Sequence, residues 1–76
     1  MNAIYEKEIG KRIRFFRESS KMTQEQLASK LQVMGCDITR SAIAKIEVGQ
    51  RHIYPDEIKL IKEFLNVSFD DLFYGK

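Results

Sequence analysis

Residues 22–34 read MTQEQLASKLQVM and residues 39–49 read TRSAIAKIEVG, and these two segments predict two short helices joined by a turn. In the first segment, Thr23 and Gln26 have the spacing of a capping box, in which a hydroxyl and an amide satisfy backbone groups at a helix start. Apolar side chains follow at helical spacing: Leu27, Leu31 and Met34. Gly35 can then end the helix at Met34 by taking a left-handed conformation.

The second segment predicts a helix over Arg40–Glu47, with Thr39 as its N-cap and Gly49 just beyond its end. The apolar positions, which helical spacing turns inward, are Ala42, Ile43 and Ile46. The outer face is left with Arg40, Ser41, Ala44 and Lys45. Only the residues on this outer face are left to contact a partner.

The same periodicity predicts three more helices and no strands. A first helix over residues 6–19 buries Ile9, Ile13 and Phe16, and a fourth opens at Pro55 and buries Ile58, Ile61 and Leu65. Ser68 and Asp71 form an acidic capping box for a short fifth helix through Leu72. We therefore predict an all-α, five-helix bundle forming one domain over residues 1–76, with an N-terminal arm over residues 1–5 and a C-terminal tail over residues 74–76.

The composition excludes several classes of protein. The chain has 76 residues, 43% of them hydrophobic, so one small core is expected and wholesale disorder is not. A single cysteine, Cys36, cannot form an internal disulfide or a zinc cluster, and we expect it to be a small buried filler. Neither a signal peptide nor a membrane span is evident, so a cytoplasmic protein is expected.

The net charge of +2 hides an asymmetry along the chain. Residues 1–51 hold ten lysines and arginines against six acidic residues, and residues 52–76 hold three against five, so the two parts carry +4 and −2. This distribution indicates one face that attracts anions, although ordinary helix-surface charge could also produce it.

Four segments in order resemble one known family. They are residues 12–17 (RIRFFR), 22–28 (MTQEQLA), 40–49 (RSAIAKIEVG) and 65–73 (LNVSFDDLF). Together they are similar to the Cro/C1-type (XRE) helix-turn-helix family, which has the lambda-repressor-like fold, and the resemblance covers about residues 6–73. It implies that the second and third helices form a helix-turn-helix that binds double-stranded DNA.

The resemblance also implies roles for individual residues. On the third helix, the base-reading positions are Arg40, Ser41, Ala44 and Lys45. The positions that contact phosphate are Thr23, Gln24, Thr39, Gln50 and Arg51. Arg17 and Glu47 match a structural ion pair between the first and third helices, whereas His52 is expected to be an exposed loop residue.

The chain departs from the family in three places. The link from Leu31 to Arg40 is longer than the usual tight turn. Lys21 stands where glycine or asparagine usually takes a left-handed conformation, and Tyr54 is a poor N-cap for the fourth helix. We expect the long link to extend the second helix by a turn and Ile38 to pack on the core.

Exposed aromatic residues leave two interpretations open. Phe15 stands beside the core residue Phe16, where the family usually carries a charge, so it either covers Tyr5 or the N-terminal arm or forms a self-association or partner surface. By resemblance the fourth and fifth helices are the dimer side, where Phe69, Phe73 and Tyr74 are the candidate surface residues.

The predicted function is sequence-specific binding of double-stranded DNA by a transcriptional regulator, expected to be a repressor that reads a pseudo-palindromic operator as a homodimer. The alternative is a protein-interaction module, such as an antitoxin or adaptor, that uses the aromatic surface to hold a regulatory protein partner. The sequence holds no nucleophile–base pair, metal-ligand cluster or phosphate-cradling glycine loop, so we expect no enzyme, no cofactor, no metal and no small-molecule ligand.

Overall fold

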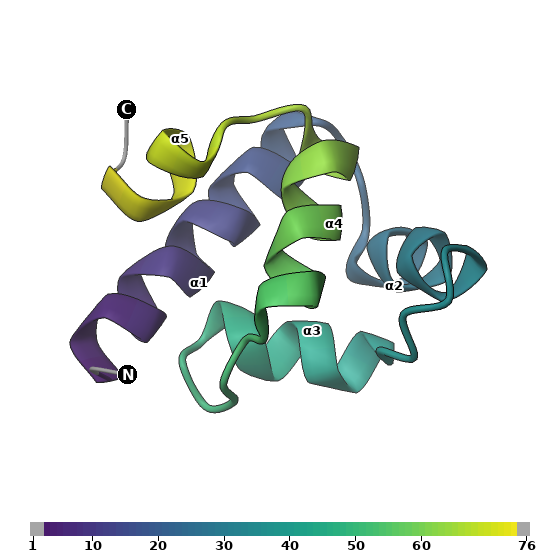
Figure 1. The fold of residues 1–76 in the computed structure, drawn as a ribbon, viewed down its shortest axis with the longest axis horizontal. Coiled ribbons are helices and arrows are strands. Elements are labelled where there is room, and N and C mark those ends of the chain that lie inside the picture. The colour runs from purple at the N-terminus through teal and green to yellow at the C-terminus, as the bar shows by residue number, and fades with distance from the viewer. Residues whose placement is uncertain (1–2, 75–76) are drawn as a thin grey trace.

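The structure is a computed structural model that describes residues 3–74, and the part described consists of five helices without a strand. The helices are α1 (Ala3–Ser19), α2 (Gln24–Val33), α3 (Arg40–Glu47), α4 (Pro55–Leu65) and α5 (Phe69–Tyr74). Figure 1 shows α3 crossing one edge of the bundle, with α2 at one of its ends and the start of α1 near the other. The predicted all-α, five-helix class is confirmed.

Three helices begin with the side-chain caps expected from the sequence. The Thr23 hydroxyl accepts the Gln26 N–H at 3.0 Å while Gln26 Oε1 accepts the Thr23 N–H at 2.8 Å. Thr39 caps α3 through the Ala42 N–H at 3.1 Å. At α5, the Ser68 N–H donates to Asp71 and the Asp71 N–H donates to Ser68 Oγ. Local chemistry therefore sets these three starting points.

The first four helices end in one common way, on a residue with a left-handed backbone. Those residues are Lys21, Gly35, Gly49 and Asn66, with φ between 57° and 86°. After α2, for example, the Gly35 N–H donates to Gln32 O at 3.0 Å and the Cys36 N–H to Leu31 O at 2.9 Å, the paired bonds of a Schellman motif. Lys21 adopts this conformation without being glycine, as its position in the sequence suggested, and carries mild strain.

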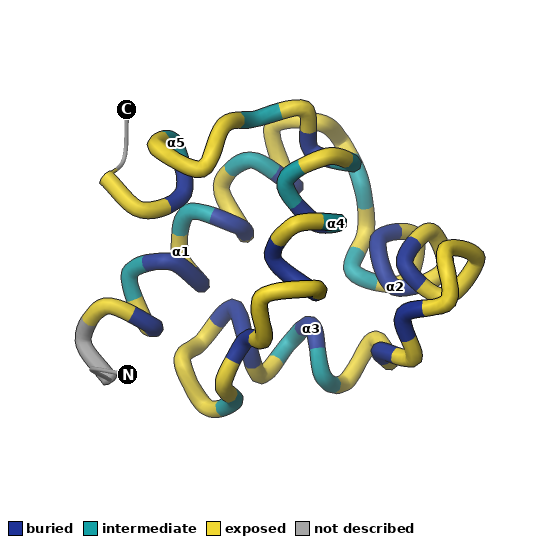
Figure 2. The backbone as a smooth tube through the Cα atoms, in the orientation of Figure 1, coloured by how far each residue is buried: buried dark blue, intermediate teal, exposed yellow. Residues whose placement is uncertain are grey.

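One continuous apolar core lies among the helices (Figure 2). The fully buried side chains are Ile13, Leu27, Leu31, Ile38, Ile43, Ile46, Ile61 and Leu72. Ile38 lies in the long link between α2 and α3 and packs on this core, as expected, and Gln32 Nε2 holds its carbonyl at 2.7 Å. Cys36 is buried in the same link, and burial, with the negative charge of Glu57 and Asp56, raises the pKa of its thiol. The link is thus an ordered part of the fold.

The chain ends differ from the expected arm and tail. The first helix begins at Ala3, so residues 3–5 of the predicted arm are helical, and Tyr74 closes α5 instead of starting a tail. The apolar stripe that marked the first helix starts only at Ile9, so periodicity could not reveal the preceding turns. Residues 1–2 and 75–76 of the predicted arm and tail lie outside the described residues.

Gly10 lies at a close approach between α1 and α3. A Cβ atom at Gly10 would lie 2.1 Å from Ile46 O and 3.1 Å from Glu47 O, both of which are backbone oxygens. The absence of a side chain at this position therefore allows the end of α3 to pack directly on α1.

Candidate nucleic-acid interface

The helix-turn-helix presents two capped helix N-termini. Thr23 begins α2 and Thr39 begins α3, and each hydroxyl accepts a backbone N–H. An accepting hydroxyl still has its own proton to donate, and a helix N-terminus carries partial positive charge, so both ends can hold a phosphate oxygen. The geometry is compatible with the roles that the sequence indicated for these two residues.

The outer face of α3 is polar, positively charged and accessible. Arg40, Ser41 and Lys45 are exposed and Ala44 is half-buried, while Ile43 and Ile46 lie in the core. Among the residues that the structure describes, neither Arg40 nor Lys45 takes part in an ion pair. Both side chains are therefore free to donate hydrogen bonds to a ligand, and the four residues predicted to read bases share one face.

Glu47, the last residue of α3, is bonded to two other helices. Arg17 of α1 donates from Nε to Glu47 Oε2 at 2.7 Å and from its Nη2 to Glu47 Oε1 at 3.1 Å. Gln24, the first residue of α2, donates from Nε2 to Glu47 Oε1 at 3.0 Å. Both charged side chains are buried, with 9% of Arg17 and 1% of Glu47 exposed. The carboxylate thus joins α1, α2 and α3 at one point.

This bond also limits how Gln24 can meet DNA. One amide proton of Gln24 points at Glu47, which leaves the other proton and the carbonyl oxygen for an outside partner. The sequence suggested Gln24 as a phosphate contact but gave no sign of its bond to Glu47. A glutamine held in one orientation loses less conformational entropy on binding than a free one.

The loop between α3 and α4 is held by two carboxylates. Arg51 makes a bidentate pair with Glu57 at 2.9 and 3.0 Å and donates to His52 O at 2.9 Å. His52 Nδ1 lies 2.5 Å from Oε1 of the buried Glu6, although 70% of the His52 side chain is exposed. Arg51, a predicted phosphate contact, is thus already paired within the protein, whereas its predicted companion Gln50 is exposed.

The Arg51–Glu57 pair changes the titration of both groups. Burial alone would raise the pKa of Glu57, but the hydrogen bonds from Arg51 and from the Tyr54 N–H, with the arginine charge, outweigh burial and lower it. The hydrogen bond to Glu57 raises the pKa of Arg51. Glu57 also supplies, at 3.0 Å, the acceptor for the Tyr54 N–H at the start of α4, where Tyr54 provides no side-chain cap, as expected.

This pair predicts a loss of stability in acid. Because folding lowers the pKa of Glu57, its contribution is complete above the unfolded value of about 4.3 and is lost as pH falls through the lower folded value. Glu57→Gln should destabilise the protein by about 1–3 kcal/mol at pH 7, and the deficit should shrink toward pH 3. Urea unfolding at pH 7, 5 and 3 measures this, with exposed Glu25→Gln as the control. A deficit that stays constant with pH would contradict the assignment.

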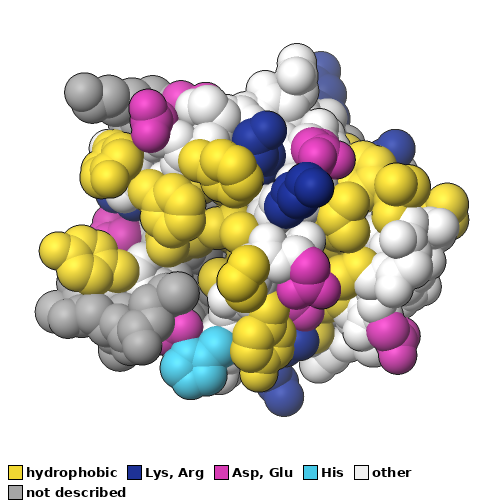
Figure 3. Space-filling model, in the orientation of Figure 1, with side chains coloured by type: hydrophobic (Ala, Val, Ile, Leu, Met, Phe, Trp, Pro, Cys, Tyr) yellow, Lys and Arg dark blue, Asp and Glu magenta, His cyan; other side chains and the backbone are white. Residues whose placement is uncertain are grey.

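Apolar side chains gather over α5 and beside the start of α4 (Figure 3). Phe69 is 43% and Phe73 39% exposed, and their rings stack with centroids 6.3 Å apart. Tyr74 is exposed at the end of the same helix. Phe15 lies on α1, 63% exposed, with its ring edge-on to Phe16 at 5.3 Å. Tyr5 is 66% exposed as well, so neither ring shields the other from solvent to any great extent.

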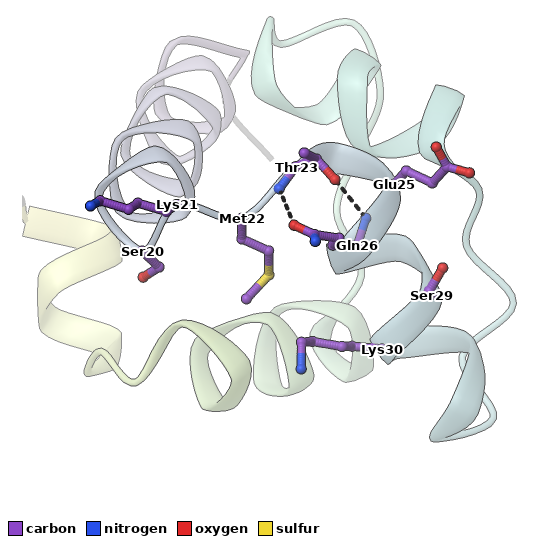
Figure 4. Close-up of a pocket in the computed structure, with 8 residues that line it drawn as sticks. All are labelled: Ser20, Lys21, Met22, Thr23, Glu25, Gln26, Ser29 and Lys30. Carbon is purple, nitrogen blue, oxygen red and sulfur yellow. Dashed lines mark hydrogen bonds between the residues drawn. The ribbon is translucent and has the colours of Figure 1, made fainter.

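A shallow hollow lies beside the start of α2 (Figure 4). It is lined by Ser20, Lys21, Met22, Thr23, Glu25, Gln26, Ser29 and Lys30. Figure 4 shows the two capping bonds that join Thr23 and Gln26, and it shows Lys30 extending toward α4, where its Nζ lies 5.9 Å from the Phe64 ring centroid. Within residues 3–74, no group of three or more His, Cys, Asp or Glu side chains could hold a metal ion.

The helix-turn-helix family model matches residues 13–72. The chain belongs to the Cro/C1-type helix-turn-helix family. Helix-turn-helix domains of this family are typical of DNA-binding transcription regulators, a class that is typically non-enzymatic.

One curated relative of this helix-turn-helix protein is the HTH-type transcriptional activator BcrR of Enterococcus faecalis, which is 33% identical over 69 residues. The match covers 91% of this chain and 31% of the relative, so the chain spans about a third of that protein's length. No solved structure gives a significant match. None of the helices described here is long and apolar enough to cross a membrane.

Several tertiary contacts that position the helices were not evident from the sequence. Arg12 donates from Nη1 to Leu72 O at 3.1 Å and to Phe73 O at 3.0 Å, which ties α5 to α1. The link from Gln24 to Glu47 and the close approach at Gly10 were also missed. The Arg51–Glu57 pair could have been found, because the two residues are six apart and Glu57 stands in the first turn of α4.

Proposed function

We propose that the protein binds a specific double-stranded DNA site by placing α3 in the major groove. The observation that carries this proposal is the outer face of α3, where Arg40, Ser41 and Lys45 are exposed and unpaired within the described part of the chain. An α-helix fits the major groove, and arginine and lysine are the side chains that most often read guanine there. The phosphate contacts from Thr23, Gln24, Thr39 and Gln50 would fix the helix in register.

Substituting the reading face should reduce specific binding. We expect Arg40→Ala to cost about 1–3 kcal/mol at the preferred site and to relax the base preference at one position. Lys45→Ala should behave in the same way at a second position. The measurement is affinity for the preferred duplex and for random duplex at one fixed salt concentration, with exposed Lys59→Ala on α4 as the control. An unchanged ratio of the two affinities in both variants would show that α3 is not the reading element.

We further propose that the protein binds as a homodimer on a pseudo-palindrome, with α5 on the dimer side. Support comes from the stacked, partly exposed rings of Phe69 and Phe73. Exposed aromatic pairs of this kind are typical of protein interfaces. The acidic C-terminal part of the chain would then lie away from the phosphates, in agreement with the charge distribution.

The dimer proposal predicts opposite results for two aromatic residues. Phe69→Glu should weaken self-association tenfold or more, because a charge would replace an apolar contact. A tenfold loss corresponds to about 1.4 kcal/mol of association free energy. Phe15→Glu, on α1, should leave the dimer intact. Sedimentation equilibrium of both variants, with circular dichroism to check folding, gives the answer. Dissociation by Phe15→Glu alone would move the interface to α1.

The direction of regulation is proposed to be repression, because a bound domain can block transcription by occupancy without any further contact. The similar E. faecalis protein is named an activator. One reporter experiment therefore has to distinguish repression from activation. A reporter gene placed behind the selected site should fall in expression when the protein is supplied. A rise would assign the protein as an activator.

A second candidate is a protein-interaction module, favoured by the 63% exposure of Phe15 on α1, outside the two helices of the helix-turn-helix. An antitoxin or adaptor would hold its protein partner there. Partner capture that survives Arg40→Ala and Lys45→Ala but is lost in Phe15→Glu, in a protein that selects no DNA site, would favour this function over DNA reading.

A further inference from the structure

Gly49 packs against a lysine from another helix. At this position φ is +78°, and a Cβ atom there would lie 3.0 Å from Lys7 Cβ, 3.1 Å from Lys7 Cγ and 3.2 Å from Lys7 Cα. The stem of Lys7, in α1, therefore runs directly over the residue that follows α3 and its C-cap. Figure 1 shows the start of α1 beside the loop between α3 and α4, at the same edge of the bundle as α3.

The acidic side chains around Lys7 are bonded to other groups. Glu6 is buried against His52, and Glu8 lies 3.8 Å from both Lys11 and Arg12. Lys7 itself is exposed and takes part in no ion pair among the residues that the structure describes. Its ammonium group is therefore free to meet an anion from outside.

The predicted cation of the adjacent loop is not free in this way. Arg51 is held by both oxygens of Glu57, and the two opposite charges largely cancel at a distance. Gln50, which directly follows Gly49, is exposed and uncharged. At this end of α3, the unpaired cations among the described residues are thus Lys45 on α3 itself and Lys7 on α1, and the loop between α3 and α4 adds none.

We propose that Lys7 contacts the DNA backbone. Packed against Gly49, it supplies the positive charge for the phosphate next to the C-terminal end of the reading helix. This inference rests on the proposed function. A lysine that neutralises one phosphate adds affinity on every DNA sequence alike and steepens the salt dependence of binding. Arg51, in contrast, acts mainly by holding the loop.

The test is the salt dependence of DNA binding by the full chain. Lys7→Gln should lower the slope of log affinity against log salt by about 0.9 and should weaken binding to preferred and random duplex by the same factor. Lys7→Arg should restore the wild-type slope, and exposed Lys59→Gln should leave it unchanged. The outcomes also separate this inference from the proposed function. If the wild-type protein binds no duplex, the proposed function fails. If it binds and Lys7→Gln keeps the wild-type slope, only the role of Lys7 is overturned.

Discussion

Glu47→Ala is expected to destabilise the protein by about 3–5 kcal/mol, because it leaves the buried guanidinium of Arg17 with only the exposed carboxylate of Glu18, 4.0 Å away, as a counter-charge. A chain of this size is stabilised by only about 4–11 kcal/mol in total, so we expect the variant to unfold on mild heating or in low urea. The physical cause is burial: both members of the pair are almost inaccessible and the arginine donates two bonds to the same carboxylate. Urea unfolding at pH 7 measures the loss.

A matched double variant separates the unpaired charge from the lost pair. Arg17→Met combined with Glu47→Leu replaces both charged groups with apolar ones of similar volume, and it should recover most of the stability. If the pair mainly fixes the angle between α1 and α3, the double variant should nevertheless bind its preferred DNA less selectively. A double variant as unstable as Glu47→Ala would mean that the pair itself is the stabilising element.

Gly10→Ala is the second large effect, expected at about 3 kcal/mol or more of destabilisation. Within an isolated helix, alanine is favoured over glycine by about 1 kcal/mol, so helix propensity alone predicts the opposite sign. The tertiary contact should win because the new methyl group would lie 2.1 Å from a backbone oxygen of Ile46, which cannot turn aside like a flexible side chain. Thermal and urea unfolding both report the sign.

Gly35→Ala provides the control for this substitution. Gly35 has φ +86°, and nothing lies within 4 Å of a Cβ atom built there, so only backbone strain opposes the change. The expected cost is of order 1–3 kcal/mol from conformation alone. Stabilisation by Gly10→Ala would show that α1 and α3 do not approach as closely as described.

Most of the helix set could be predicted because local chemistry determines it. Thr23, Thr39 and Ser68 cap their own helices with groups three residues away, and Gly35 and Gly49 end theirs in a left-handed conformation that glycine adopts without steric cost. Signals of this kind are complete within a few residues of sequence. The start of α1 was missed because the apolar stripe, which begins at Ile9, does not reach its first turns.

The candidate site was predictable only in part, for a physical reason. Which residues of α3 face outward follows from the helical period once the apolar ones are turned inward. Which side chains are free follows from tertiary contacts: Arg12 bonds carbonyls 60 and 61 positions away, and Gln24 bonds a carboxylate 23 positions away. Arg51 was therefore expected on the phosphates and is paired within the protein, while Lys7 drew no attention.

The most direct test of the central claim, that α3 reads a specific DNA site, is selection of bound sequences from random duplex DNA by the full chain. We expect enrichment of an inverted repeat whose half-sites are centred about 34 Å, or one helical turn, apart, and loss of that enrichment in the Arg40→Ala, Lys45→Ala double variant. Failure to enrich any sequence at both low and moderate salt, or the same enriched sequence with the double variant, would contradict it.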